Sequence, residues 1–283
     1  MQKEVLWTDG VLYFSTHGKR CIGRNNCMSK ILWINPIGTN IYDEKINRVL
    51  AEIKQPMNLV DVISLKKGPE HLEYMYYEAL VTPDILHIIK QAEKDGYDAA
   101  IIGCFYDLAL FEAKELVDKM VIIAPAQASS YIAAMLGHKF SVIVTRDKCI
   151  PQMTDRMISY GMKEKLASFK SLGLGVNELH TNEQNTFEIM KRKAGEAIEQ
   201  DGAEVIVLGC TIQFGFYEKL QRYLGVPVID AVAASLKYAE YLAELKNRFN
   251  WIHSKKCCFE SPPIAEIKKW NIEEQYNVKG IWE

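Results

Sequence analysis

The chain has 283 residues, of which 48% are hydrophobic and 25% charged, and its formal net charge is −2. This is an ordinary globular composition, and a chain of this length can bury a large core without disulfides or a metal. The balanced charge excludes the basic footprint of nucleic-acid binding, and no apolar stretch approaches the roughly 18 residues that span a bilayer. We therefore expect no nucleic-acid partner and no membrane partner.

The cysteines and the first residues predict the compartment. Seven cysteines, an odd number without small-scaffold spacing, fit a reducing compartment better than a disulfide framework. The first ten residues include Glu4 and Asp9 and lack a basic segment followed by an apolar one, so we expect no signal peptide. Together these features favour a cytoplasmic protein.

Short runs rich in Val, Ile and Leu alternate with longer segments of helical period from residue 30 onward. Runs that are apolar on both faces and separated by helices are typical of a mainly parallel sheet covered on each side. The pattern predicts an α/β fold with strands at 31–35, 59–65, 99–104, 121–124, 140–145, 205–210 and 226–230.

An internal repeat divides the chain. The segment DGYDAAIIGC at 95–104 recurs as DGAEVIVLGC at 201–210, an interval of 106 residues that also pairs Ala128 with Ala234 and Ser129 with Ser235. We expect two similar lobes related by a pseudo-twofold axis, with the active site between them. The expected segments are an N-terminal extension (1–29), lobe 1 (30–125, completed by a helix at about 231–246), lobe 2 (126–230) and a C-terminal extension (247–283).

Each repeat ends its central strand with Gly-Cys. Ligands of open α/β sheets bind outside the carboxyl ends of the strands, where Cys104 and Cys210 are expected. Helices beginning near Leu108 and Gly215 would direct free N–H groups towards these thiols, so we expect them to ionise more readily than a free cysteine. Gly103 and Gly209 would allow a ligand to approach closely or the backbone to take an unusual angle.

Two facing thiols match the chemistry of inverting a carbon-bound hydrogen. One thiolate removes the proton from one face while the other thiol protonates the opposite face, and no cofactor is required. The N–H groups of Phe105 and Thr211 could bind the oxyanion that develops on an adjacent carbonyl. A cysteine at a strand end is usually a small core residue, but two copies at matched positions favour catalysis.

At these motifs the chain resembles the aspartate/glutamate/hydantoin racemase superfamily over about residues 30–246. The hydantoin and allantoin racemase branch is the more similar, because Phe-Tyr-Asp follows Cys104 where glutamate racemases have Asn-Thr. The signatures are Ile34-Asn35-Pro36, the Gly-Cys-Phe-x-Asp stretch at 103–107, the Leu-Gly-Cys-Thr stretch at 208–211 and Val-Pro-Val-Ile-Asp at 226–230.

The resemblance implies a cofactor-independent enzyme with Cys104 and Cys210 as its acid/base pair. It also implies ligand contacts at Asn35, Thr145 and Thr211, and assembly as a homo-oligomer, by default a dimer. The family's Asn-Pro-Asn-Thr/Ser is Asn-Pro-Ile-Gly here, and its Ala-Gly-Met after the second cysteine is Thr-Ile-Gln. These departures affect substrate identity more than the proton chemistry.

Other polar residues have less specific interpretations. Asp230 either orients a ligand or caps the helix that begins near Ala231. The six histidines lack metal-type spacing, and the Cys21/Cys27 and Cys257/Cys258 pairs are poorly spaced for zinc, so we expect no metal.

Three functions remain open from the sequence. The first is a racemase or epimerase acting on a small hydantoin-type or amino-acid substrate. The second is a decarboxylase or cis/trans isomerase of the same superfamily, and the third is a non-catalytic protein that binds a small molecule. We expect a small-molecule partner in each case.

Overall fold

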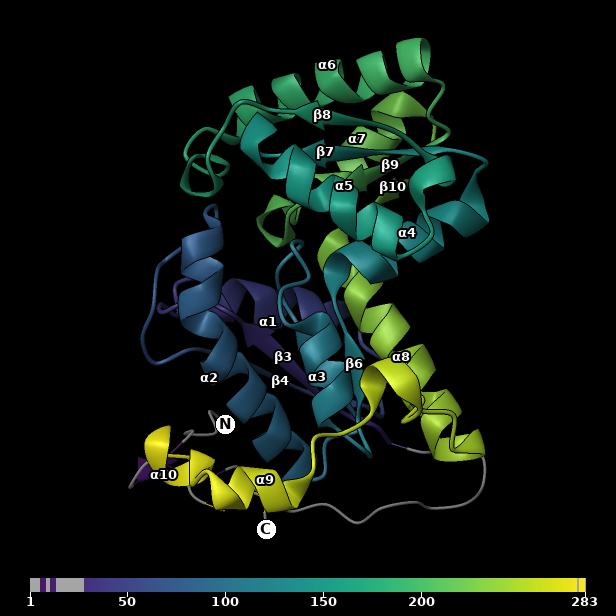
Figure 1. Ribbon diagram of the computed structural model, residues 1–283. Helices are drawn as coiled ribbons and strands as arrows, with labels where there is room; N and C mark the ends of the chain where they lie inside the picture. Colours follow the sequence, from purple (N-terminus) through teal and green to yellow (C-terminus); the bar gives the residue numbers. More distant parts are fainter. Residues whose placement is uncertain (1–5, 9–10, 14–27, 279, 283) are drawn as a thin grey trace.

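Two four-stranded parallel sheets form the two lobes of the molecule (Figure 1). The computed structural model describes residues 6–8, 11–13, 28–278 and 280–282. The lobe 1 sheet contains β3 (Lys30–Asn35), β4 (Leu59–Ser64), β5 (Ala99–Ile102) and β6 (Val121–Ile123). The lobe 2 sheet contains β7 (Phe140–Val144), β8 (Leu166–Ser171), β9 (Val205–Leu208) and β10 (Val228–Ile229).

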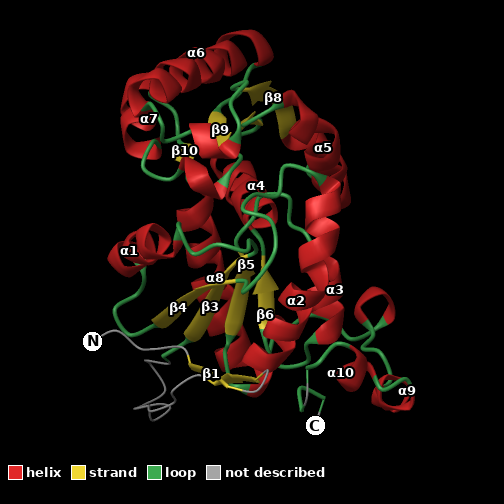
Figure 2. Cartoon of the chain, turned by 90° about the vertical axis from the view of Figure 1, so that its left-hand side faces the viewer, coloured by secondary structure: helices red, strands yellow, loops and turns green. Residues whose placement is uncertain are grey.

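Helices follow the strands and cover both faces of each sheet, as expected of an α/β fold (Figure 2). Lobe 1 strands alternate with α1 (Asp43–Ile53), α2 (Met75–Lys94) and α3 (Leu110–Leu116). Lobe 2 strands alternate with α5 (Ile150–Ser159), α6 (Glu183–Asp201) and α7 (Tyr217–Leu224), and α4 (Pro125–Leu136) and α8 (Ala231–Phe249) follow the last strand of each sheet.

The strand order confirms the predicted repeat. The sheets run β4-β3-β5-β6 and β8-β7-β9-β10, so each strand of lobe 1 has a counterpart at the same place in lobe 2. The central strands β5 and β9 are buried along their whole length because helices cover both faces. The sequence prediction missed β8, an edge strand whose half-buried residues (LASFKS) form no apolar run.

The helices α4 and α8 pack on each other between the lobes. Each also covers a sheet: α8 lies against β5 and β6 of lobe 1, and α4 lies against β9 of lobe 2. The repeat pairs Ala128/Ala234 and Ser129/Ser235 are all buried on these helices. Small side chains let the two helices approach closely, which holds the lobes together.

The terminal segments lie outside the two sheets. The strands β1 (Leu6–Thr8) and β2 (Val11–Tyr13) form an antiparallel pair, and Cys21 and Cys27 lie outside the described residues. The C-terminal extension contains α9 (Ile264–Lys269) and α10 (Ile272–Gln275), which lie beside lobe 1 in Figure 1. Among the described residues, no helix is both long and apolar enough to cross a membrane.

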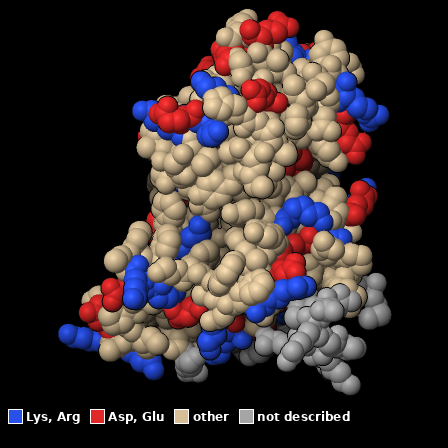
Figure 3. Space-filling model, turned by 90° about the vertical axis from the view of Figure 1, so that its right-hand side faces the viewer, with Lys and Arg blue, Asp and Glu red and all other residues tan. Residues whose placement is uncertain are grey.

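Charges of both signs are interspersed on the face shown in Figure 3. Lys and Arg lie next to Asp and Glu over the lower lobe, and a broad uncharged area covers the centre of the upper lobe. This face therefore offers no extended basic surface of the kind that binds a polyanion.

Candidate active site

A pocket lies between the lobes, where the carboxyl ends of both sheets meet. The loops after β3, β4 and β5 contribute residues from lobe 1, and the loops after β7, β8 and β9 contribute residues from lobe 2. The lining residues of most interest are Asn35, Tyr42, Glu70, His71, Glu73, Cys104, Phe105, Tyr106, Thr145, Cys210 and Thr211.

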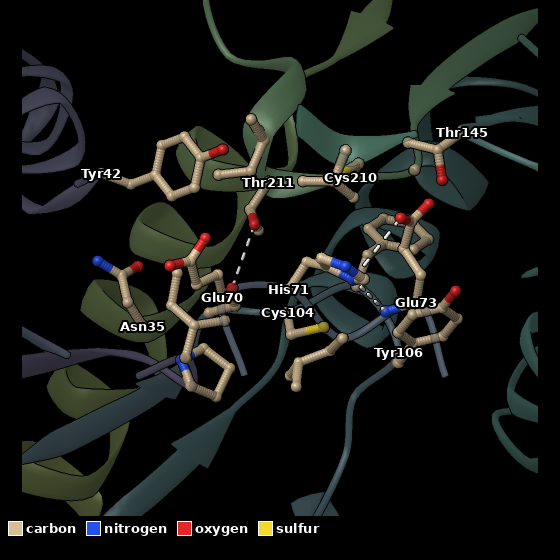
Figure 4. Close-up of a pocket in the computed structure, with 18 of the residues that line it drawn as sticks. Asn35, Tyr42, Glu70, His71, Glu73, Cys104, Tyr106, Thr145, Cys210 and Thr211 are labelled. Atoms are coloured by element: carbon tan, nitrogen blue, oxygen red, sulfur yellow. Dashed lines mark hydrogen bonds and ion pairs between the residues drawn. The ribbon is translucent and has the colours of Figure 1, made fainter. Parts of the chain in front are cut away.

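Each lobe supplies one cysteine to this pocket. Cys104 follows β5 by two residues and Cys210 follows β9 by two residues, so the repeat places them at equivalent positions. Figure 4 shows the Cys104 side chain entering from the lower lobe and Cys210 from the upper lobe. Both are partly exposed free cysteines that line the same pocket.

The expectation that these thiols ionise easily is wrong. Burial raises the pKa of Cys104 well above its ordinary value, and burial raises the pKa of Cys210 to about 12. The expected N–H groups are present: the amide of Tyr106 bonds Cys104, and the amides of Ile212 and Gln213 bond Cys210. These amides lower each pKa, but by less than desolvation raises it.

The glycine before each cysteine serves packing. A Cβ atom on Gly103 would lie 2.6 Å from the Trp33 indole, and one on Gly209 would lie 2.7 Å from Cγ1 of Val142. Neither glycine has a positive φ, so the reason for glycine is the neighbouring side chain and not an unusual backbone angle. Close packing against the adjacent strand therefore requires a glycine immediately before each cysteine.

Asn35 is held by two short hydrogen bonds. Its Oδ1 accepts from Trp33 Nε1 at 2.7 Å, and its Nδ2 donates to Asp43 Oδ1 at 2.6 Å. Asp43 also accepts from the Ser64 hydroxyl at 2.6 Å. Asn35 lines the pocket with its amide fixed in one orientation, since both ends of the amide are already bonded.

Three more predicted site residues line the pocket. Phe105 is buried beside Cys104, and Thr145 lies at the end of β7 with Oγ1 3.4 Å from the sulfur of Cys149. The Thr211 hydroxyl donates to the carbonyl of Gly103 at 3.1 Å, which joins the two cysteine loops across the lobes.

Asp230 lies outside the pocket lining. Its Oδ1 accepts from the amides of Val232 and Ala233, both at 2.9 Å, so it caps the N-terminus of α8. We therefore leave Asp230 out of the proposed site. Asp107 acts similarly for α4: it accepts from the amides of Ala126 and Gln127 at 2.8 Å.

The loop after β4 contributes pocket residues that the sequence motifs did not indicate. Glu70, His71 and Glu73 all line the pocket, as does Tyr42 before α1. The absence of metal-type spacing gave the histidines no role in the sequence, whereas His71 lines the pocket. The signal was present, because three ionisable side chains within four residues follow a strand end, where ligands bind.

Within the described residues, no group of three or more His, Cys, Asp or Glu side chains is placed to hold a metal ion. Cys257 and Cys258 are exposed in the C-terminal segment.

The fold and the pocket define a class of protein. Two α/β lobes related by a repeat, each contributing one cysteine to a shared pocket, make this a two-lobed α/β protein with its candidate site between the lobes.

Comparison with known proteins identifies the family. Residues 31–239 match the Asp/Glu/Hydantoin racemase family. The hydantoin racemase of Pseudomonas sp. (strain NS671) is 33% identical over 216 residues, 76% of this chain and 86% of that protein. The hydantoin racemase of Rhizobium meliloti is 36% identical over 209 residues, 74% of this chain and 86% of that protein.

A solved structure agrees with this match. An allantoin racemase from Klebsiella pneumoniae has a TM-score of 0.77 and 27% sequence identity, and the match covers 83% of this chain and 94% of that one. The chain belongs to the Asp/Glu/hydantoin racemase family, on the hydantoin racemase-like side that the residues after Cys104 predicted. It is a racemase, and therefore an isomerase.

Proposed function

We propose that this racemase inverts a carbon next to a carbonyl group in a hydantoin-type substrate, with Cys104 and Cys210 as the acid/base pair. The observation that carries the proposal is the shared pocket, which is lined by one thiol from each lobe at matched positions of the repeat.

The proton balance follows from this arrangement. The thiolate of one cysteine takes the proton from the substrate carbon and becomes a thiol, and the electron pair delocalises into the adjacent carbonyl. The thiol of the other cysteine then gives its proton to the opposite face and becomes a thiolate. One turnover therefore exchanges the protonation states of Cys104 and Cys210, and the opposite enantiomer reacts with the exchanged form.

The environment of the thiols suits the removal of a proton from a weakly acidic carbon. A thiol with a raised pKa is a stronger base once it has lost its proton, and the amides that bond each sulfur stabilise the thiolate. The backbone N–H groups of Phe105 and Thr211 are our candidates for binding the developing oxyanion, because they belong to the two cysteine loops.

The hydantoin class is favoured over free amino acids by two observations. Hydantoin racemases are the curated relatives with 33% and 36% identity, and the structural match at 27% identity is an allantoin racemase. The pocket also contains the carboxylate of Glu70, which would repel a substrate carboxylate.

The test is racemisation and hydrogen exchange in heavy water, followed by optical rotation and NMR. Both enantiomers of several 5-substituted hydantoins, aspartate and glutamate are offered to the wild type and to Cys104→Ser and Cys210→Ser. We expect inversion of hydantoins by the wild type and its loss, by about 100- to 10,000-fold, in both variants. Full turnover by either variant would contradict the two-base mechanism.

Cys149→Ser is the matched control. Cys149 is buried near the pocket, where its sulfur accepts a hydrogen bond from Tyr106 at 2.8 Å, but it does not line the pocket. This variant should retain inversion within about threefold of the wild type, since no step of the proposed chemistry uses Cys149. Consumption of a malonate-type or maleate-type acid without exchange would instead support a decarboxylase or cis/trans isomerase.

We also propose that the enzyme needs no cofactor, works in the cytoplasm and assembles as a homodimer. Support comes from the thiol chemistry, which is complete without a cofactor, and from the odd number of cysteines. Sedimentation of the purified protein tests the assembly, and turnover after exhaustive dialysis against a chelator tests the cofactor.

A further inference from the structure

Glu73 carries a buried carboxylate oxygen that the mechanism does not use. Its side chain is only 9% exposed, and Oε1 has no hydrogen-bond partner within the part of the chain that the structure describes. Glu73 belongs to the loop after β4 and lines the pocket. A buried carboxylate without a donor is costly, so this oxygen favours a ligand that supplies one.

The groups that face Glu73 leave this acceptor free. Arg146 Nη1 lies 3.8 Å from Oε1, which is beyond hydrogen-bond distance, and its side chain is 39% exposed. His71 Nδ1 lies 3.6 Å from Oε2 but accepts the Glu73 amide hydrogen at 3.4 Å, so this nitrogen has no proton to offer the carboxylate. Arg146 therefore balances the charge of Glu73 without occupying Oε1.

Glu73 occupies one end of the pocket. In Figure 4 it lies with Thr145 and Tyr106 on one side of the cysteines, and Asn35 and Tyr42 lie on the other side. Glu73 is also close enough to Cys210 for its charge to raise the pKa of that thiol. The carboxylate therefore lies near the reacting centre but at its periphery.

The chemistry of proton removal decides which part of the substrate meets Glu73. Negative charge develops on the ring carbonyl as the proton leaves, and a carboxylate beside the ring would oppose it. The substituent on the reacting carbon develops no such charge. A carboxylate near the substituent is compatible with turnover, whereas one near the ring is not.

We infer that Glu73 is a specificity-determining residue that accepts a hydrogen bond from an uncharged amide or ureido N–H group on the substituent of the reacting carbon. The inference rests on the proposed function and narrows its substrate class to hydantoins with a donor-bearing side chain. An uncharged donor fits because Arg146 already neutralises the carboxylate, and an apolar or anionic substituent would leave Oε1 unpaired.

Three hydantoins of nearly equal shape test the inference. Their C5 substituents are 2-carbamoylethyl, 3-methylbutyl and 2-carboxyethyl, which offer an N–H donor, no polar group and a negative charge. For the wild type we expect kcat/KM to be about 10- to 100-fold higher for the carbamoylethyl compound than for the methylbutyl compound, with the carboxyethyl compound lowest.

The Glu73→Met variant removes the acceptor and keeps an unbranched side chain of similar length. It should lower the ratio of kcat/KM for the carbamoylethyl hydantoin to kcat/KM for the methylbutyl hydantoin by about 10- to 100-fold, mainly through KM of the carbamoylethyl compound. Glu73→Gln is the milder variant, because it retains an oxygen acceptor, and it should lose less than Glu73→Met.

Arg146→Gln is the matched control, because it breaks the ion pair between the lobes and leaves the Glu73 acceptor in place. If Glu73 serves only to hold the lobes together, both Glu73→Met and Arg146→Gln lower turnover of all three compounds equally. That outcome, or a wild type that does not discriminate between carbamoylethyl and methylbutyl, overturns the inference.

Binding of the same compounds to a Cys104→Ser/Cys210→Ser variant, measured by calorimetry, separates this inference from the proposed function. The expected order of affinity without turnover by the wild type would overturn the proposed function and support the role of Glu73. Turnover without the expected order would overturn the role of Glu73 alone, and neither binding nor turnover would overturn both.

Discussion

The loops that carry Cys104 and Cys210 occupy the same place in the two lobes but are built differently. After Cys104 the backbone passes through positive φ at Asp107 (50°) and Ala109 (56°) before α3 begins. After Cys210 a single 3-10 turn, Thr211–Gln213, leads to Gly215 at φ 86° and then to α7. The repeat therefore preserves the placement of the thiol and not the loop.

The caps of the helices that join the lobes differ in the same way. In lobe 2 the residue before α8, Asp230, caps that helix. The residue before α4 is Ala124, and its helix is capped instead by Asp107 from the Cys104 loop. Asp107 also accepts from the Tyr160 hydroxyl of lobe 2 at 2.7 Å, so the first cysteine loop is tied to the second lobe.

The two thiols consequently meet different charges. Glu78 and Asp107 raise the pKa of Cys104, whereas Cys149 and Glu73 raise the pKa of Cys210. The two cysteines therefore combine matched geometry with unmatched electrostatics.

The largest expected effect distinguishes the two thiols by the face of the substrate carbon at which each one removes and returns a proton. In Cys104→Ser the remaining thiolate can remove and return a proton on one face only, so one enantiomer should exchange hydrogen in heavy water without inversion. In Cys210→Ser the other enantiomer should do so, and inversion should fall about 100- to 10,000-fold in both. NMR on each pure enantiomer measures this, and identical behaviour of the two variants would contradict it.

The second prediction concerns the two capping carboxylates. Burial raises the pKa of Asp107 to about 6, above its ordinary value of 3.8. The folded state therefore binds this proton more tightly than the unfolded state, and the associated stability is lost as the pH rises through about 6. The free energy of unfolding of the wild type, relative to Asp107→Asn, should fall by up to about 3 kcal/mol between pH 4 and 7.

Urea denaturation at each pH measures this difference. Asp230→Asn is the comparison, because burial also raises the pKa of Asp230 and its difference should slope in the same direction. If the free energy of unfolding of the wild type relative to Asp107→Asn stays constant or rises with pH, burial does not raise the pKa of Asp107.

The third prediction concerns the pH dependence of turnover. Both thiols have raised pKa values, with Cys210 at about 12, while the reaction needs one thiolate and one thiol. The kcat/KM for racemisation should therefore rise about tenfold per pH unit from pH 7 towards pH 10. An N3-methylated hydantoin is the control, since it has no acidic ring proton in this range. A maximum below pH 8 would contradict the raised pKa values.

The smallest expected effect tests the direct bond between the loops. Thr211→Val removes the hydrogen bond from its hydroxyl to the Gly103 carbonyl and should lower the free energy of unfolding by about 1 kcal/mol. Thr145→Val is the control, because its hydroxyl makes only a 3.4 Å contact with Cys149, and it should cost less. Equal losses measured by urea denaturation would show that the loops are joined mainly by packing.

Local pattern predicted the strands of both sheets except the edge strand β8. The runs at 99–104 and 205–210 were correct because a strand buried on both faces must be apolar throughout. The edge strand β8 was missed because solvent on one side permits Ser and Lys. Asp230 was ambiguous for a related reason, since a carboxylate after a strand can cap a helix or meet a ligand, and only its bonds to Val232 and Ala233 decide.

The sequence by itself determined the α/β fold, the repeat and the pairing of Cys104 with Cys210, because these depend on periodicity and on spacing along the chain. The tertiary structure decided what surrounds the thiols: that burial outweighs the amide hydrogen bonds in setting their pKa, and that Glu73 lines the same pocket. Desolvation and unpaired acceptors depend on which loops come together between the lobes, and a local sequence pattern does not predict that.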